Sequence, residues 1–168
     1  FMRHETPYPQ AAAERFGTNG SPVLHVAKIA NGGAMGRLTL GRVFGGTLHE
    51  GDALSVGTDP VRTGSLFLVQ GEKTAKQSEA REGDIVAVAR IDGARCGMTM
   101  GQTRGDHAAS KSPEFPTRNA AVAITTRDRK DDVKLSTALH RLCEEDPALE
   151  WSQDQASQET ILRGINDE

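Results

Sequence analysis

The chain has 168 residues, 36% of them apolar and 26% charged, and a formal net charge of -3. This length and composition are typical of a soluble globular protein with one ordinary domain or two small ones. No apolar run approaches the ~20 residues that span a bilayer, no secretory leader opens the chain, and the negative charge disfavours a protein that holds RNA by diffuse positive charge. We therefore expect a cytoplasmic, monomeric protein without membrane contact.

Two stretches have the composition of linkers. Residues 1–20 lack apolar periodicity and contain two prolines and two glycines, and residues 104–114 are polar and rich in turn-forming residues. They divide the chain into a first segment at 21–103 and a second segment at 115–168. Because the chain opens on Phe1 rather than on methionine, we expect the first linker to arrive from a further domain upstream.

The first segment carries short apolar runs separated by glycine-rich turns. Most of the 18 glycines of the chain fall before residue 106, and short strands at such spacing are typical of an all-β sandwich or barrel. The last run is apolar on both faces, which suits a strand that is covered on both sides or one that closes a small barrel. The apolar runs are 22–30, 35–48, 53–56, 65–69 and 84–91.

The second of these runs contains a break in its alternation. Leu38 and Leu40 share one face of the predicted strand, but Val43 is out of step with them. A slip of one residue at Gly41 is what a β-bulge would produce. We therefore predict a bulge at Gly41.

The triplet Glu-Gly-Asp occurs twice, at 50–52 and at 82–84, each time directly before an apolar run. Glycine can adopt a positive φ and aspartate can bond its own backbone, so each triplet predicts a tight turn into a strand. A single triplet of this kind could simply be an ordinary hairpin turn between two strands. Two copies favour a compact barrel that repeats the same turn.

The second segment has the order strand, helix, strand, strand. The helix begins at Asp131 or Asp132, either of which can cap it, and ends at Asp146-Pro147, because a residue before proline avoids the helical region. This order indicates an α+β unit, and we interpret it as a partial ferredoxin-like module that lacks its second helix. The strands are expected near 120–126, 150–152 and 159–165, and the apolar stripe of the helix is Leu135, Ala138, Leu139 and Leu142.

Two cysteines, Cys96 and Cys143, lie far apart, and no Cys/His spacing suits zinc. We interpret both as reduced thiols of a cytosolic protein, with a disulfide left open. His140 and Cys143 lie one helical turn apart, so a small cysteine hydrolase is an alternative. A cysteine beside a leucine stripe more often packs as a small apolar residue than acts as a nucleophile, and we predict no catalytic group here.

The sequence lacks the motifs that bind nucleotides or activate acyl groups. No G-x-x-x-x-G-K-[ST] loop occurs, and Gly71-Glu72-Lys73-Thr74 matches only its tail. There is no dinucleotide-binding glycine motif after a strand, no G-x-S-x-G elbow and no metal-loop spacing. The chain is therefore predicted to hold no catalytic, cofactor or metal site of its own.

Four cations are the candidates for contact with RNA. Arg37 and Arg42 lie on the predicted barrel, and Lys73 and Lys76 lie on the loop after the fourth apolar run. Arginine and lysine side chains supply most contacts to phosphate oxygens in RNA and DNA complexes. Ordinary solvated surface charge is the competing interpretation for each of them.

Residues 36–52 resemble the second domain of elongation factor G, whose pattern there is roughly G-R-L-[ST]-x-x-R-V-x-[SG]-G-x-L-x-x-G-D. The stretches at 71–73 and 82–85 are similar to the G-K-E and A-G-D-I segments of the same family. The positions that match the first pattern are Gly36, Arg37, Leu38, Arg42, Val43, Gly46, Leu48, Gly51 and Asp52.

Residues 139–147 resemble the L-x-x-L-x-E-E-D-P helix end of the third domain of that family, and Phe115-Pro116 stands in the place of its opening F-P. The segments follow in the order of the family, and the resemblance covers about residues 21–168. Two family segments differ, because G-D-T-L reads Gly-Met-Thr-Met at 97–100 and G-M-G-E-L-H-L becomes Gly-Ile-Asn-Asp-Glu at 164–168. These differences suggest a divergent, elongation factor G-like member.

The resemblance implies a mainly β chain: a small translation-factor-type β-barrel followed by a partial ferredoxin-like α+β domain. In the family the barrel rests on small-subunit ribosomal RNA and ribosomal protein beside the GTPase domain, and the α+β domain relays conformational change. GTP or GDP and Mg²⁺ would bind that GTPase domain, which this chain lacks. We expect the chain itself neither to bind nor to cleave GTP, while the intact protein would serve GTP-driven translocation in protein synthesis.

Other translation GTPases share such a barrel, so a release, initiation or ribosomal-protection type is an alternative within the same class. A stand-alone RNA-binding barrel is an alternative from a different class. Such a barrel should carry stacking aromatic side chains on one sheet face. The barrel segment supplies only Phe44 and Phe67, which disfavours it.

Overall fold

The computed structural model describes residues 20–56, 59–71, 73–101, 116–155, 157 and 159–165. These residues belong to two compact units, divided between Ser112 and Pro113. The predicted linkers at 1–20 and 104–114 lie outside the described residues, apart from Gly20. No described helix is long and apolar enough to cross a membrane.

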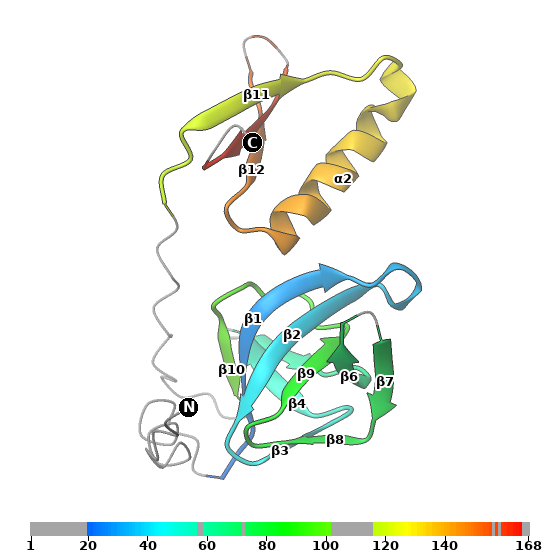
Figure 1. The fold of residues 1–168 in the computed structure, drawn as a ribbon, viewed down its shortest axis with the longest axis vertical. Helices are drawn as coiled ribbons and strands as arrows, with labels where there is room; N and C mark the ends of the chain where they lie inside the picture. The colour runs from blue at the N-terminus through cyan, green and yellow to red at the C-terminus, as the bar shows by residue number, and fades with distance from the viewer. Residues whose placement is uncertain are drawn as a thin grey trace. The chain divides into compact units, whose positions relative to one another are not determined.

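The first unit is a β-barrel in which every strand pair is antiparallel (Figure 1). Eight strands form one sheet in the order β5-β4-β10-β1-β2-β9-β6-β7, and β3 and β8 form a separate two-stranded ribbon. The predicted mainly β first segment is confirmed. Its strands are β1 (Val23–Asn31), β2 (Arg37–Phe44), β3 (Thr47–His49), β4 (Ala53–Val56), β5 (Asp59–Arg62), β6 (Leu66–Gln70), β7 (Lys73–Gln77), β8 (Glu79–Arg81), β9 (Ile85–Ala89) and β10 (Thr99–Gly101).

Two apolar clusters lie on opposite faces of the long sheet. Strand β9 serves both, since Val86 and Val88 point into the main core while Ala87 and Ala89 join an outer cluster. Both faces of β9 are therefore covered from Val86 onward, as predicted, whereas Ile85 at the start of the strand is 58% exposed. The outer cluster consists of Leu38, Leu40, Phe67, Val69, Ala87 and Ala89, and the main core includes Leu24, Val26, Ile29, Val43, Leu48, Leu54, Leu66, Ile91 and Met100.

Four strands of the barrel, β5, β7, β8 and β10, lie where the sequence shows no clear apolar run. Strand β7 is the clearest case, because all of its residues from Lys73 to Lys76 are exposed. It pairs with β6 as its one neighbouring strand, at the edge of the sheet. Backbone pairing at an edge leaves no alternating apolar signal, and lysines are common on such edges.

The predicted bulge lies next to Gly41, but it is in the neighbouring strand β1 and not in β2 itself. Strand β2 pairs with β9 without interruption, and the register shift lies in β1 between Val26 and Lys28, opposite Gly41. Val43 is out of step with Leu40 because the two side chains lie on opposite faces of β2, Val43 in the main core and Leu40 in the outer cluster. Glycine is required at position 41, since a Cβ there would lie 2.5 Å from the carbonyl oxygen of His25.

The two Glu-Gly-Asp triplets form the same turn, as predicted. The backbone N–H of His49 donates to Oδ2 of Asp52 at 2.8 Å, and that of Arg81 donates to Oδ2 of Asp84 at 2.8 Å. The middle glycines have φ values of 89° at position 51 and 93° at position 83, a region that favours glycine. Each turn therefore needs both its glycine and its aspartate.

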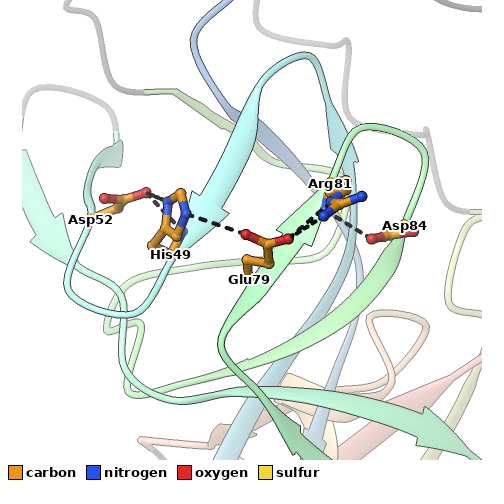
Figure 2. A network of polar contacts seen from close by, with 5 residues as sticks. All are labelled: His49, Asp52, Glu79, Arg81 and Asp84. Atoms are coloured by element: carbon orange, nitrogen blue, oxygen red, sulfur yellow. Dashed lines mark hydrogen bonds and ion pairs between the residues drawn. The ribbon is translucent and has the colours of Figure 1, made fainter.

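The turns are joined by the ribbon that precedes them, because β3 pairs with β8 and places His49 opposite Glu79. Figure 2 shows the resulting chain of polar contacts. Arg81 donates to Oε1 of Glu79 through Nε at 2.9 Å and through a terminal nitrogen at 2.8 Å. The His49 ring lies between two carboxylates, 3.7 Å from Asp52 and 3.8 Å from Glu79.

The second unit has the predicted order of strand, helix, strand, strand, with a short 3-10 turn (Arg129–Asp131) before the helix. Its antiparallel sheet has the order β11-β13-β12. This is the arrangement of the first three strands of a ferredoxin-like module, so the predicted α+β class is confirmed. The elements are β11 (Ala120–Ile124), α2 (Asp132–Glu145), β12 (Glu150–Gln153) and β13 (Thr160–Gly164).

The predicted apolar stripe of α2 is only partly buried. Leu139 is buried, but Ala138 is exposed and Leu142 is 43% exposed. Cys143 instead is half-buried, one turn after Leu139 on the helix surface. At 100° per residue, Leu139 and Cys143 lie on one side of the helix and Ala138 lies about 100° away from Leu139, so the packed face is turned toward Cys143.

Candidate nucleic-acid interface

Arg37, the first predicted RNA contact, has a structural role. Its guanidinium donates to the carbonyl oxygens of Ile91 and Ala94, each at 2.5 Å. Both acceptors lie in the loop between β9 and β10, which is distant from Arg37 in sequence. Charge-assisted bonds to two carbonyls fix this loop, and they orient the guanidinium toward the barrel.

Lys73 and Lys76 lie on strand β7, not on a loop. Lys76 forms an ion pair with Glu50, with Nζ 3.2 Å from Oε2, and Ser65 donates to the other oxygen of that carboxylate. Directly opposed residues of antiparallel strands share a face, so Lys76 shares the face of its partner Phe67 in the outer cluster. Lys73 is three positions away and lies on the opposite face of β7, so the two lysines do not form one patch.

Arg42 lies on the outer face of β2, and the register of β1 brings two further basic side chains beside it. His25 is directly opposite Arg42, and Lys28 is directly opposite Leu40. Lys28 reaches this face only because of the bulge between Val26 and Lys28, which shifts the alternation of β1 by one residue. His25, Lys28 and Arg42 thus form a basic row across β1 and β2, and no local pattern in the sequence indicates the first two.

An aromatic side chain continues the basic row. Phe44 packs edge-on to the His25 ring, with 6.2 Å between ring centroids and 70° between ring planes. The Nδ1 atom of His25 lies 2.9 Å from the Thr99 hydroxyl on β10. The imidazole is therefore held in one orientation on this face, directly opposite Arg42.

A groove opens beside Arg42, where β6 leaves β9. The two strands pair only through Leu66 and Phe67, and beyond this point they diverge. The groove has a volume of about 410 Å³. It is lined by Arg42, Leu68, Val69, Gln70, Gln77, Gly83, Asp84 and Ile85, so apolar side chains lie between polar ones.

The geometry of α2 does not favour a thiol nucleophile. Burial raises the pKa of the Cys143 thiol, which outweighs the opposing effect of a bond to the backbone of Trp151. His140 is exposed and lies 3.9 Å from Glu144 rather than activating the thiol. Both cysteines carry free thiols. Among the described residues, no group of three His, Cys, Asp or Glu side chains is arranged to hold a metal ion.

Most residues of the 36–52 motif have structural roles in the barrel. Val43 and Leu48 are core residues, and Asp52 closes a turn. Gly46 has a φ of 62°, and a Cβ there would lie 2.6 Å from a backbone carbonyl oxygen. Arg42 is the charged motif residue whose position on β2 places it on the outer face of the sheet, in register with Leu38 and Leu40.

Comparison with known proteins identifies both units. The family model "Elongation factor G domain 2" matches residues 24–102, and the model "Elongation Factor G, domain III" matches residues 115–167. A protein named "Elongation factor G-like protein" from Synechocystis sp. is 36% identical over 163 residues, which are 95% of this chain and 24% of that protein.

A crystal structure of a protein from Thermus thermophilus is similar to the chain, with a TM-score of 0.75 and 29% sequence identity. The match covers 93% of this chain and 24% of that one, so the chain spans about a quarter of the length of both relatives. The barrel and the α+β unit occur in the same order as the two family models. The chain belongs to the elongation factor G family, of which it contains domain 2 and domain III.

Proposed function

We propose that this chain is the non-catalytic, ribosome-docking and relay part of an elongation factor G-like translation GTPase. The succession of the two matched domains, over residues 24–102 and 115–167, is the observation that carries this proposal. Because the chain spans about a quarter of its relatives, GTP or GDP and Mg²⁺ would bind in another part of the intact protein, in the cytoplasm.

The Gly71–Thr74 stretch, whose sequence matches the tail of a phosphate-binding loop, gives no support for a nucleotide site in this part of the protein. Lys73, the lysine of the Gly71–Thr74 stretch, opens a β-strand. A phosphate-binding loop instead places its lysine at the start of a helix, where backbone N–H groups surround the phosphates. The barrel and the α+β unit therefore contribute binding surfaces and rigid bodies, not chemistry.

Within the barrel, the basic row of His25, Lys28 and Arg42 is the surface that best fits ribosomal RNA. Cations on a flat sheet face can contact successive phosphates, and the neighbouring Phe44 ring holds the His25 imidazole edge-on beside them. Arg42 is preferred to the other candidates because His25 and Lys28 share its face, whereas Lys73 and Lys76 lie on opposite faces of β7.

Charge reversal on the row tests this function. In the intact protein, Lys28→Glu combined with Arg42→Glu should weaken binding to small ribosomal subunits by about 10-fold or more and should flatten the dependence of affinity on salt. GTP hydrolysis without ribosomes should remain unchanged. Lys73→Glu is the matched control, because Lys73 lies on the face of β7 that is opposite to the outer cluster. Equal loss in both variants would place the contact elsewhere, and unchanged binding in the double variant would refute docking through this face.

A stand-alone RNA-binding barrel is the remaining alternative class. Phe67 packs in the outer cluster and Phe44 packs on His25, so neither provides an open stacking platform. Binding of the chain alone to short single-stranded RNA, at an affinity equal to that for ribosomal subunits, would favour this alternative.

A further inference from the structure

The tip of the β1–β2 hairpin is a short, hydrogen-bonded turn that carries a methionine. Residues Gly33–Met35 form a 3-10 turn, closed by a bond from the N–H of Gly32 to the carbonyl of Gly36 at 2.8 Å. Met35 itself donates through its N–H to the carbonyl of Gly32 at 3.1 Å. These bonds hold the backbone at the tip of the hairpin in a single turn.

The Met35 sulfur contacts a strand that is distant in sequence. The Thr74 hydroxyl on β7 donates to Sδ of Met35 at 3.8 Å. Thr74 is the cross-strand partner of Val69, which packs on the outer cluster. The thioether therefore joins the hairpin tip to the β6–β7 hairpin at the margin of this cluster.

Met35 is also the accessible methionine among those that the structure describes. It is 38% exposed, whereas Met100 is fully buried and Met98 packs partly buried against the main core. Oxidation of a thioether requires the oxidant to reach the sulfur, so exposure ranks the reactivity of methionines. The same side chain is thus both reachable from solvent and used as a contact.

We propose that Met35 is the oxidant-reactive residue of the barrel, and that its conversion to the sulfoxide alters the contact between the β1–β2 tip and β7. A peroxide is the co-reactant. The sulfur lone pair attacks one peroxide oxygen, the O–O bond breaks, an S–O bond forms, and with hydrogen peroxide the second oxygen leaves as water. The thioether is oxidised by two electrons and the peroxide is reduced.

The product changes the chemistry at the margin of the outer cluster. A sulfoxide is polar and larger than a thioether, and its oxygen accepts hydrogen bonds far better than sulfur does. The Thr74 hydroxyl therefore exchanges a weak acceptor for a strong one at a different position, and the tip must move to accommodate it. Sulfoxide reductases with a thiol as the electron donor reverse this reaction, so the change is reversible.

Peptide mapping by mass spectrometry after brief exposure of the folded chain to hydrogen peroxide tests the reactivity. Met35 should oxidise about 10-fold faster than Met98 and Met100. Thr74→Val removes the donated hydrogen bond from the sulfur and should raise the Met35 rate by about 2-fold, while Thr47→Val, on β3, should leave it unchanged. Oxidation of Met100 as fast as Met35 would overturn the assignment, and an unaltered rate in Thr74→Val would overturn the role of the contact.

Nuclear magnetic resonance on the oxidised chain tests the structural consequence. The amide signals of residues 32–36 and of Thr74 should shift, and those of β3 should stay in place. Met35→Leu keeps an apolar side chain without the sulfur, so peroxide should leave these amide signals unchanged in that variant. Shifts of the same size in Met35→Leu would show that another residue is responsible.

Discussion

Thr39 offers a sharp test of the barrel core. Its side chain is fully buried, and its hydroxyl has no hydrogen-bond partner among the described residues. Burying an unpaired hydroxyl costs about 1–3 kcal/mol, and a buried methyl in its place contributes about 0.8 kcal/mol. Thr39→Val, which preserves the shape of the side chain, should therefore raise the free energy of unfolding by at least about 1 kcal/mol.

Thr63 is the matched control, because it is also buried but its hydroxyl donates to the carbonyl of His49 at 2.8 Å. Thr63→Val removes the hydroxyl that donates to the carbonyls of His49 and Asp52, and it should lower the free energy of unfolding by about 1–2 kcal/mol. The two substitutions make the same chemical change and should have opposite signs.

Native-state hydrogen exchange of the slowest amides in β2 and β9 measures this free energy for the barrel alone, independently of the second unit. A gain of about 1 kcal/mol should also raise the melting temperature of a domain of this size by about 4–8 °C. If Thr39→Val destabilises the barrel as much as Thr63→Val does, the buried Thr39 hydroxyl must have a partner and the reasoning fails.

Three further predictions concern backbone and titratable groups. Gly46→Ala should lower the free energy of unfolding by about 2–4 kcal/mol, because its Cβ would lie 2.6 Å from a carbonyl oxygen. Gly51→Ala, whose Cβ would meet nothing within 4 Å, should lower it by only about 1 kcal/mol, because of its positive φ. Equal losses of stability in urea unfolding would contradict this. The pKa of Glu50 is lowered, first by the bond from Ser65 and then by Lys76, so its stabilising effect is present above the unfolded pKa and is lost as the pH falls through the lower folded value. Glu50→Gln should accordingly show a smaller loss of stability on acidification, and an unchanged pH profile would refute this. Because burial raises the pKa of Cys143, its thiol should react with a maleimide more slowly at neutral pH than an unfolded-chain thiol does, and a fast reaction would revive the cysteine hydrolase.

The sequence predicted turns and helix ends correctly, because these features depend on the residue types of a few neighbouring positions. The Glu-Gly-Asp turns needed only a positive φ at glycine and a short carboxylate that bonds the preceding backbone. The helix at Asp132–Glu145 ends where Pro147 forbids a further turn. The family itself followed from these same positions, because turn glycines and core residues make up most of the 36–52 motif.

The RNA-contact candidates show the limit of such inference. Arg37, Arg42 and Lys76 look alike in sequence, yet one bonds carbonyls, one lies on the outer face and one pairs with Glu50. These outcomes depend on partners as far as 57 positions away along the chain, which no local pattern identifies.

The sequence by itself therefore determined the two units, their fold classes and their family, since turns, periodicity and capping are properties of short segments. The tertiary structure decided which cations share a surface. His25 lies beside Arg42 because β1 pairs with β2 in this register, and Lys28 shares that face only because of the one-residue bulge after Val26. Strand register is set by the packing of both sheet faces together, and a single residue of shift moves a side chain from the core to the solvent.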